Sequence, residues 1–172
     1  MNELSKFIRD IPDFPRKGIL FKDITPLLRD PGAFSRALDA MAQHHAGDRI
    51  DAVAAVESRG FIFGAALALK LGAGFVPIRK PGKLPYQTLD ESYTLEYGTD
   101  TIQMHADAVA KGDRILLVDD LLATGGTARA AMNLLARQGA DLVGASFLIE
   151  LAFLSGRARL GKAPVFALLR YD

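Results

Sequence analysis

The segment from residue 115 to residue 137 constrains the fold more than any other part of the chain. It opens with four aliphatic residues at 115–118, a run typical of a buried parallel strand. Asp119 and Asp120 follow, then a turn of small residues, and then residues 128–137, whose composition and spacing are helical. A strand, a tight turn and a helix N-terminus predict an anion-binding site, because unpaired backbone amides and the helix dipole both attract negative charge there.

The turn has the composition of a phosphate site. Its side chains are small, so a phosphate can reach the backbone amides, and two hydroxyls add donors. No lysine lies in the turn, so it is not the loop that cradles nucleoside triphosphates. The residues predicted to hold the phosphate are Ala123, Thr124, Gly125, Gly126 and Thr127.

The two acids before the turn limit what the ligand can be. Carboxylates repel a phosphate, so Asp119 and Asp120 make sense only if the ligand also presents hydroxyls or a magnesium ion. Ribose 5-phosphate fits, with its 2- and 3-hydroxyls donating to the acids and its phosphate in the turn. The alternative is a solvated acid pair that happens to precede a helix.

A second strand and turn repeat this pattern. Residues 52–56 form a buried-strand run, which passes through Glu57, Ser58 and Arg59 into an apolar helix at 61–71. Parallel strands end at a common edge of the sheet, so we expect a second anion site beside the first. Arg59 is predicted to be functional rather than a surface charge, because the positive end of a helix dipole disfavours an arginine.

A basic loop follows the next predicted strand at 74–78. Arg79, Lys80 and Lys83 place three cations within five residues. The alternative is a solvated loop, but two phosphate sites are already predicted nearby, so we expect these residues to contact a diphosphate.

Composition sets the remaining bounds. The chain has 172 residues, of which 49% are hydrophobic, and a formal net charge of +1, so we expect one domain spanning residues 1–172 and no nucleic-acid or membrane partner. It has no cysteine and no apolar N-terminal leader, which predicts a cytoplasmic location. His44 and His45 end a predicted helix, and we expect a structural role for them rather than metal binding.

Strand and helix patterns alternate along the chain, which predicts an α/β fold with a mainly parallel central sheet flanked by helices. Helices are expected at 3–10, from Thr25 as N-cap, and at 33–45. Residues 85–92 are expected to be an irregular part of a mobile lid at 81–105, whose hairpin arms lie at 93–98 and 101–105. A short helix and a strand at 164–169 are expected to end the chain.

The string from Val118 to Thr127 resembles the phosphoribosyl pyrophosphate (PRPP) motif of type I phosphoribosyltransferases, in the form carried by the adenine-specific members. The likeness extends from about Phe14 to Leu151. It implies the fold of that family, with a small N-terminal hood within residues 1–30. It also implies the reaction of adenine and PRPP to AMP and diphosphate in purine salvage, Mg2+ carried mainly by PRPP and water without direct protein ligands, and a homodimer.

The resemblance also assigns roles to the residues that bind the base. Phe21 would stack on adenine, while the backbone of Leu20 and Lys22 reads its edge. The unaided sequence favours Phe21 as a core aromatic. Lys17 stands where the family usually has proline, which puts the rigidity of this segment in doubt.

Further roles from the resemblance concern the diphosphate and the lid. The Glu57–Ser58 turn would hold the diphosphate, Arg59 would approach both base and diphosphate, and Arg79 would reach the partner subunit's site. Glu96 in the lid would face the base, which makes Glu96 and Arg59 the candidate catalytic residues. Spacing alone makes Glu96 a solvated acid at a strand edge.

Two other functions remain open at this point. One is a phosphoribosyltransferase acting on guanine, xanthine, hypoxanthine or orotate. The other is a regulator that senses PRPP without catalysis, although the chain shows neither an added DNA-binding segment nor a basic face in its charge balance.

Overall fold

The computed structural model describes residues 3–94 and 98–172, and the chain divides into two compact units, residues 1–40 and 41–172. The prediction of a single domain over the whole chain stays a prediction. Among the described residues, no helix has both the length and the apolar character that a membrane crossing requires.

The N-terminal unit contains a short 3-10 helix, η1 (Glu3–Phe7), and an antiparallel pair of strands, β1 (Arg9–Pro12) and β2 (Leu20–Asp23). The helix predicted at 3–10 therefore ends early, because residues from Arg9 onward pair with β2. Helix α1 (Thr25–Arg29) follows, and α2 (Pro31–His44) begins in this unit.

The predicted cap of α1 is wrong. Ile24 occupies the N-cap position, and Thr25 is the first helical residue. Asp23 takes over the capping role, since its carboxylate accepts hydrogen bonds of 2.9 Å from both the backbone N–H and the hydroxyl of Thr25. A threonine and an aspartate two residues apart are both good caps, and spacing alone did not separate them.

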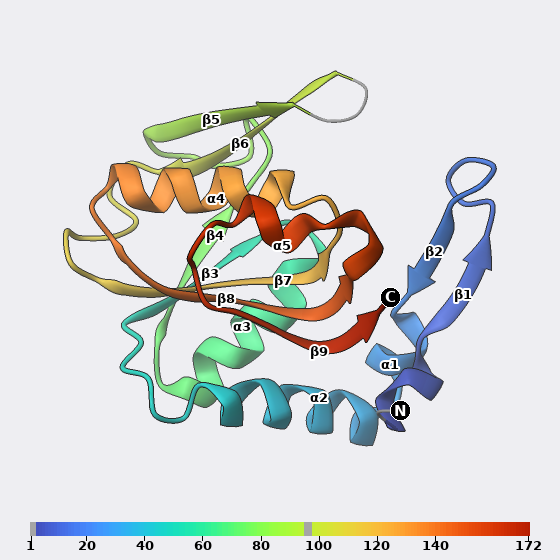
Figure 1. Ribbon diagram of the computed structural model, residues 1–172. Coiled ribbons are helices and arrows are strands. Elements are labelled where there is room, and N and C mark those ends of the chain that lie inside the picture. The colour runs from blue at the N-terminus through green and yellow to red at the C-terminus, as the bar shows by residue number, and fades with distance from the viewer. Residues whose placement is uncertain (1–2, 95–97) are drawn as a thin grey trace. The chain divides into compact units, whose positions relative to one another are not determined.

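The second unit is built on a five-stranded parallel sheet in the order β4-β3-β7-β8-β9 (Figure 1). This confirms the predicted α/β fold class. Its strands are β3 (Ala52–Val56), β4 (Gly74–Ile78), β7 (Arg114–Leu122), β8 (Asp141–Leu151) and β9 (Val165–Tyr171). Its helices are α3 (Arg59–Leu71), α4 (Gly126–Arg137) and, between η2 (Ala152–Leu154) and β9, the short α5 (Gly156–Arg159).

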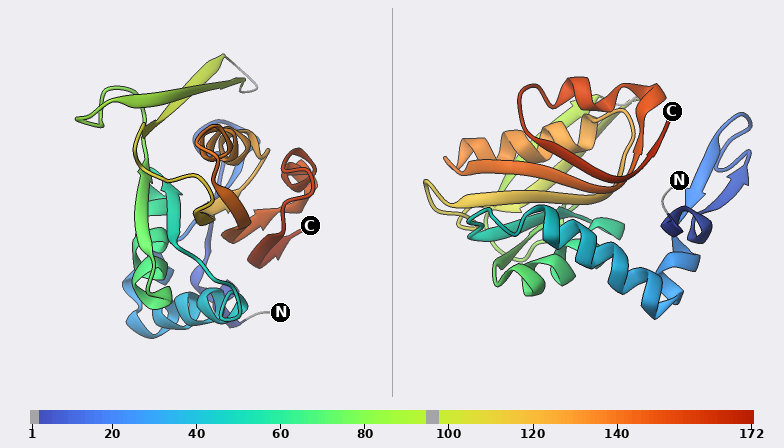
Figure 2. Two further views of the ribbon diagram at one scale, coloured as in Figure 1. Left: turned by 90° about the vertical axis from the view of Figure 1, so that its left-hand side faces the viewer. Right: turned by 60° about the horizontal axis from the view of Figure 1, so that its bottom comes forward.

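The direction of chain travel reverses between β3 and β7. The β3–α3–β4 unit moves toward one edge of the sheet, whereas β7–α4–β8 moves toward the other. Right-handed crossovers in opposite directions place their helices on opposite faces, and Figures 1 and 2 show α3 and α4 so arranged. Ligand sites of open parallel sheets lie at such a switch point, beyond the carboxyl ends of the strands.

The strands around this point are buried on both faces. In β3, Val53 to Ala55 are fully buried, and in β7 Ile115 to Val118 are as well. A cluster of buried hydrophobic side chains joins the sheet to helix α4 and to the hairpin described next. Its members include Ile78, Ile102, Met104, Leu117, Leu134 and Phe147. Each such side chain contributes roughly 1.5–3 kcal/mol on burial, so the sheet provides a rigid base for the turns at its edge.

A two-stranded hairpin, β5 (Thr88–Thr94) and β6 (Thr99–His105), packs along α4. The prediction that residues 85–92 are irregular is wrong from Thr88 onward, because the polar residues there pair with β6. Asn133 donates to the Glu91 carboxylate (2.8 Å) and Arg137 to the Asp90 carbonyl (2.6 Å). The base of the expected lid is thus attached to α4, and its mobility stays a prediction.

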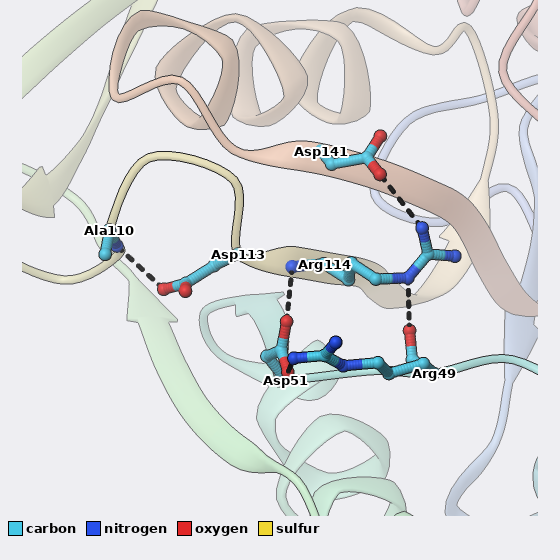
Figure 3. Close-up of polar contacts among 6 residues, drawn as sticks. All are labelled: Arg49, Asp51, Ala110, Asp113, Arg114 and Asp141. Atoms are coloured by element: carbon cyan, nitrogen blue, oxygen red, sulfur yellow. Dashed lines mark hydrogen bonds and ion pairs between the residues drawn. The ribbon is translucent and has the colours of Figure 1, made fainter.

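At the amino-terminal edge of the sheet, Arg114 connects three strand starts (Figure 3). Its backbone N–H donates to the Asp51 carboxylate (2.9 Å), and its guanidinium donates to the Arg49 carbonyl (2.8 Å) and to Asp141 (3.0 Å). The hydrogen bond from the Arg114 N–H lowers the pKa of Asp51. These contacts lie at the opposite ends of the strands from the two predicted anion sites.

The two adjacent histidines at the C-terminal end of α2, whose last residue is His44, make structural contacts. The ring of His44 stacks on Phe166 with 4.0 Å between centroids, and His45 Nδ1 lies 3.0 Å from the Asp48 carboxylate. Two effects lower the pKa of His44: burial of the ring is the larger, and repulsion by the nearby His45 is the second. A positive charge on His44 is therefore disfavoured at this helix end.

Candidate active site

The two predicted anion sites meet at one edge of the sheet. Strand β3 ends at Val56 and α3 begins at Arg59, while β7 ends at Leu122 and α4 begins at Gly126. Because β3 and β7 are neighbouring parallel strands, both turns lie at their carboxyl ends, side by side. Strand β7 is longer than predicted and carries the two acids within it.

The turn after β7, residues 123–127, forms a small concave site, hereafter the phosphate turn. A cavity of about 80 Å³ is lined by Asp119 and residues 121–128, which include all five residues predicted to hold a phosphate. Gly125 is the N-cap of α4 at φ +79°, a left-handed conformation that favours glycine. The cavity therefore lies at a helix N-terminus, where backbone N–H groups and the helix dipole favour an anion.

Asp119 and Asp120 both line a larger cavity of about 530 Å³ next to the phosphate turn. Asp120 is 5% exposed and pairs with Arg59, whose Nε lies 2.7 Å from its carboxylate. The backbone N–H of Asp120 donates to Asp119 Oδ1 at 2.8 Å. The two acids are thus held in place and partly desolvated. They are not the solvated acid pair that the sequence left open as an alternative.

Burial raises the pKa of both acids. The pKa of Asp119 lies well above its usual value, first because the carboxyl is desolvated and second because Asp120 is close. Burial also raises the pKa of Asp120, and the Arg59 charge only partly offsets this effect. Raised carboxyl pKa values in a cleft are characteristic of functional sites, where a ligand with hydroxyls or a cation supplies the missing partners.

Gly60, which was not predicted as a site residue, lets α3 approach Asp119. A Cβ at this position would lie 2.7 Å from Asp119 Oδ1 and 3.3 Å from the Val118 carbonyl oxygen. Only a residue without a side chain fits between the helix and the acid.

Glu57 organises the basic loop. Its carboxylate accepts hydrogen bonds from Arg79 (2.9 and 3.3 Å) and from the backbone N–H of Lys80, and Lys83 Nζ lies 3.6 Å away. Burial alone would raise the pKa of Glu57, but these hydrogen bonds lower it below its usual value. The carboxylate therefore holds the cations in place, while its own contact with ligand stays a prediction.

Four of the six residues predicted in this turn and the basic loop line the larger cavity, namely Glu57, Ser58, Arg59 and Lys80. The peptide bond between Glu57 and Ser58 is cis. Arg79 binds Glu57 within its own chain and also donates to the Lys83 carbonyl at 3.1 Å. Its predicted reach to a partner subunit stays a prediction.

Two residues of the hairpin, Tyr93 and Asp100, complete the cavity and were not predicted. They pair across β5 and β6, and the Tyr93 hydroxyl donates to Asp100 at 3.1 Å. Asp100 also pairs with Lys80, and the Thr127 hydroxyl donates to Tyr93 at 3.1 Å. One polar chain thus connects the basic loop, the hairpin and the phosphate turn. The alternating pattern predicted a strand at Tyr93 but left Asp100 between the two predicted arms, and it did not indicate which face of the hairpin meets the site.

The residues predicted to bind a base lie on β2 of the N-terminal unit. Phe21 makes an edge-to-face contact with Phe14, with 5.1 Å between ring centroids, and Leu20 is 47% exposed. Lys22 Nζ lies 2.6 Å from the Asp10 carboxylate. Their role with a base stays a prediction. Glu96, the predicted catalytic acid, lies outside the described residues.

Comparisons with known proteins show the family of this chain. The family described as the phosphoribosyl transferase domain matches residues 25–162. The chain is 56% identical to the adenine phosphoribosyltransferase of Geotalea daltonii over 171 residues, which cover 99% of this chain and 100% of the relative.

Two solved structures extend the comparison. The adenine phosphoribosyltransferase of Thermoanaerobacter pseudethanolicus superposes with a TM-score of 0.96 at 51% identity, covering 98% of each chain. The enzyme from Saccharomyces cerevisiae, solved with an imino-altritol bisphosphate and adenine, gives a TM-score of 0.93 at 44% identity over 97% of each chain.

The fold and the paired anion turns define the class as a phosphoribosyltransferase. Within that class, this chain belongs to the adenine phosphoribosyltransferase family, as the resemblance of the PRPP motif predicted.

Proposed function

We propose that this chain transfers the phosphoribosyl group of PRPP to adenine, giving AMP and diphosphate in purine salvage. The observation that carries this proposal is the single cavity of about 530 Å³ in which an acid pair lies between a phosphate turn and a cationic turn. The relative from yeast was solved with adenine and a sugar-like bisphosphate, which supports the same pair of ligands here.

PRPP spans the two turns in this proposal. Its 5-phosphate occupies the phosphate turn, where the backbone amides of α4 and the Thr124 hydroxyl donate to it, and the Thr127 hydroxyl exchanges its hydrogen bond to Tyr93 for one to the phosphate. The ribose hydroxyls donate to Asp119 and Asp120, which supplies the partners that two desolvated carboxyls lack. The diphosphate lies along Ser58, Lys80 and Lys83, where cations and backbone groups stabilise the charge that develops as it leaves.

Magnesium is part of the proposal. The donors that line the cavity near the acid pair are two adjacent carboxylates, and one of them is already paired with Arg59. Mg2+ is usually held by one or two carboxylates together with substrate phosphates and water, so this donor set fits an ion that arrives on PRPP. When bound, the ion neutralises diphosphate charge.

The remaining chemistry concerns the base. Phe21 stacks on adenine, and the backbone of Leu20 and Lys22 reads its edge, while Arg59 orients base and diphosphate. Glu96 manages the proton on the purine through N7. A general acid or base of this kind contributes roughly 100- to 10,000-fold in rate.

The activity is tested by incubating the purified chain with Mg2+ and PRPP and offering adenine, guanine, hypoxanthine, xanthine or orotate in separate reactions. We expect AMP from adenine, detected by chromatography, and little product from the other bases. Turnover of another base in preference to adenine would contradict the base assignment, and PRPP binding without any turnover would indicate a regulator.

Glu96 is tested separately. We expect Glu96→Ala to keep the affinity for PRPP, measured by calorimetry, because the acid faces the base and not the sugar. Turnover should fall by roughly 100- to 10,000-fold. Turnover equal to that of the unchanged chain would remove Glu96 from the mechanism.

A homodimer and a cytoplasmic location complete the proposal. Helix α3 and the edge strand β4 expose Ile62 (40%), Leu69 (85%) and Phe75 (37%), and Phe75 packs edge to face on Phe61. An apolar surface of this kind supports contact with a second copy of the chain.

A further inference from the structure

The phosphate turn rests on the first residue of α5, Gly156, and the two backbones touch without a side chain between them. A Cβ added to Gly125 would lie 2.4 Å from the Gly156 carbonyl oxygen. In the other direction, a Cβ added to Gly156 would lie 2.0 Å from the Ala123 carbonyl oxygen and 2.9 Å from the Gly125 nitrogen. The 123–125 backbone is therefore bounded by Gly156, on a segment some 30 residues later in the chain.

The residue after Gly156 fixes this segment to the sheet. Arg157 forms a two-pronged ion pair with Glu150 at the end of β8, with Nε–Oε1 3.0 Å and Nη2–Oε2 2.5 Å. Its Nη1 also donates to the Val165 carbonyl at the start of β9 (2.7 Å). Glu150 is 4% exposed, so the acceptor end of the pair is held within the fold. A guanidinium with all three nitrogens engaged holds the short α5 in one orientation.

The site needs this rigidity because its donors are main-chain groups. A side chain can adjust its torsions to a ligand, whereas a backbone amide moves only when the whole turn moves. Misplacement by about 1 Å of groups that position a ligand can reduce rates by roughly 100-fold. The contact on Gly156 lies directly behind the residues that line the phosphate cavity.

We propose that Gly156 and the Glu150–Arg157 pair are positioning residues for the 5-phosphate of PRPP, acting through the shape of the phosphate turn. This inference rests on the proposed function of that turn. None of the three residues lines either cavity. The diphosphate end of the site is built on other strand ends, with Glu57 after β3 and the basic loop after β4.

This separation of the two ends supplies the test. Ribose 5-phosphate probes the phosphate turn, and inorganic diphosphate with Mg2+ probes the basic loop. We expect Gly156→Ala to weaken ribose 5-phosphate binding by about 10- to 100-fold in calorimetry, because the Ala123 carbonyl must move. Diphosphate affinity should change less than about twofold, whereas a purely structural role would weaken both ligands alike. Gly47→Ala is the matched control, since a Cβ there meets nothing within 4 Å.

A second variant covers the case in which Gly156→Ala does not fold. Arg157→Lys keeps the charge but loses the fork, and we expect the same selective loss of ribose 5-phosphate binding, in the same direction and smaller. Arg49→Lys is its control, because Arg49 pairs with Asp51 at the other edge of the sheet, where the two side chains are 80% and 32% exposed.

The outcomes are distinct. Unchanged ribose 5-phosphate affinity in the folded variants, or equal losses for both ligands, would overturn the positioning role. Failure of the unchanged chain to bind ribose 5-phosphate at all would instead overturn the proposed function.

Discussion

Gly60 shows how much the acid pair depends on a residue that contributes no functional group. The helix passes so close to Asp119 that a methyl group would lie 2.7 Å from its Oδ1. The carboxylate must therefore rotate or the helix must retreat when a side chain is added. Either movement displaces an acceptor that the ribose hydroxyls require under the proposed function.

We expect Gly60→Ala to raise the KM for PRPP by about tenfold or more, because an acceptor for the sugar is displaced. Steady-state kinetics at saturating adenine measure this change. Gly47→Ala serves as the control and should leave the KM for PRPP as it is. An unchanged KM in Gly60→Ala would show that Asp119 is not held in place by the helix.

The site residues that could be predicted from the sequence are those whose role depends only on their neighbours in the chain. The acid pair and the phosphate turn follow directly from a strand, two acids and a run of small residues. Gly60, Tyr93, Asp100 and Gly156 acquire their roles from contacts between distant segments. Nothing in their immediate neighbours distinguishes them from ordinary turn, strand or helix residues.

At the scale of elements, the hairpin and the phosphate turn are connected by one tyrosine. The Tyr93 hydroxyl accepts from Thr127 and donates to Asp100, so β5 is linked to the start of α4. The Lys80–Asp100 pair, in which the pKa of the lysine is raised, extends the link to the basic loop. Burial alone would lower that pKa, but the hydrogen bond to Asp100 and the further interactions with Tyr93 and Asp100 together outweigh the effect of burial.

We expect Tyr93→Phe to lower the free energy of unfolding by about 1–3 kcal/mol, since two hydrogen bonds of roughly 0.5–1.5 kcal/mol each are lost. Urea denaturation measures the difference. Tyr86→Phe is the control, because Tyr86 is 58% exposed. Equal stability of the two variants would mean that the tyrosine link adds nothing to the fold.

Element types were predicted better than element ends. The strands β3 and β4 have the predicted bounds. A short, continuous aliphatic run bounded by turn residues favours a buried strand over other secondary structure. Strand β5 was missed at 88–92 because its residues are polar, and what holds them extended is pairing with β6 and contacts with α4. Likewise, β7 continues through its acids because β8 pairs with it there.

At the scale of the whole molecule, the Glu150–Arg157 pair makes stability depend on pH. Arg157 hydrogen-bonds to the Glu150 carboxylate and lowers its pKa in the folded chain. A lowered folded-state pKa adds stability above the unfolded value of about 4.3, and this contribution is lost as pH falls through the folded-state pKa.

We therefore expect the unchanged chain to lose stability below about pH 4.3, and Glu150→Gln to show a smaller loss over the same range. Denaturation midpoints measured at several pH values give both slopes. Parallel pH profiles for the two proteins would exclude Glu150 as a source of the dependence. At neutral pH the variant should be less stable, because Arg157 loses its charged partner.

The proposed homodimer predicts that dimerisation depends on the exposed apolar surface of α3 and β4. Leu69→Asp on α3 places a charge on the exposed apolar surface, and we expect it to shift the chain toward monomer in sedimentation velocity. Phe153→Asp is the control, since Phe153 is 62% exposed on η2, away from α3 and β4 in the sequence. A dimer that survives Leu69→Asp, or an unchanged chain that is monomeric, would contradict the proposed face.

Arg114 joins three strand starts at the edge of the sheet remote from both turns (Figure 3). An engineer who wished to retarget the enzyme to other sugar-phosphate donors could therefore randomise the turns after β3 and β7 and leave residues 49, 51, 114 and 141 untouched. Such a library would vary recognition while keeping its scaffold, which makes the chain a practical starting point for directed evolution of new nucleotide syntheses.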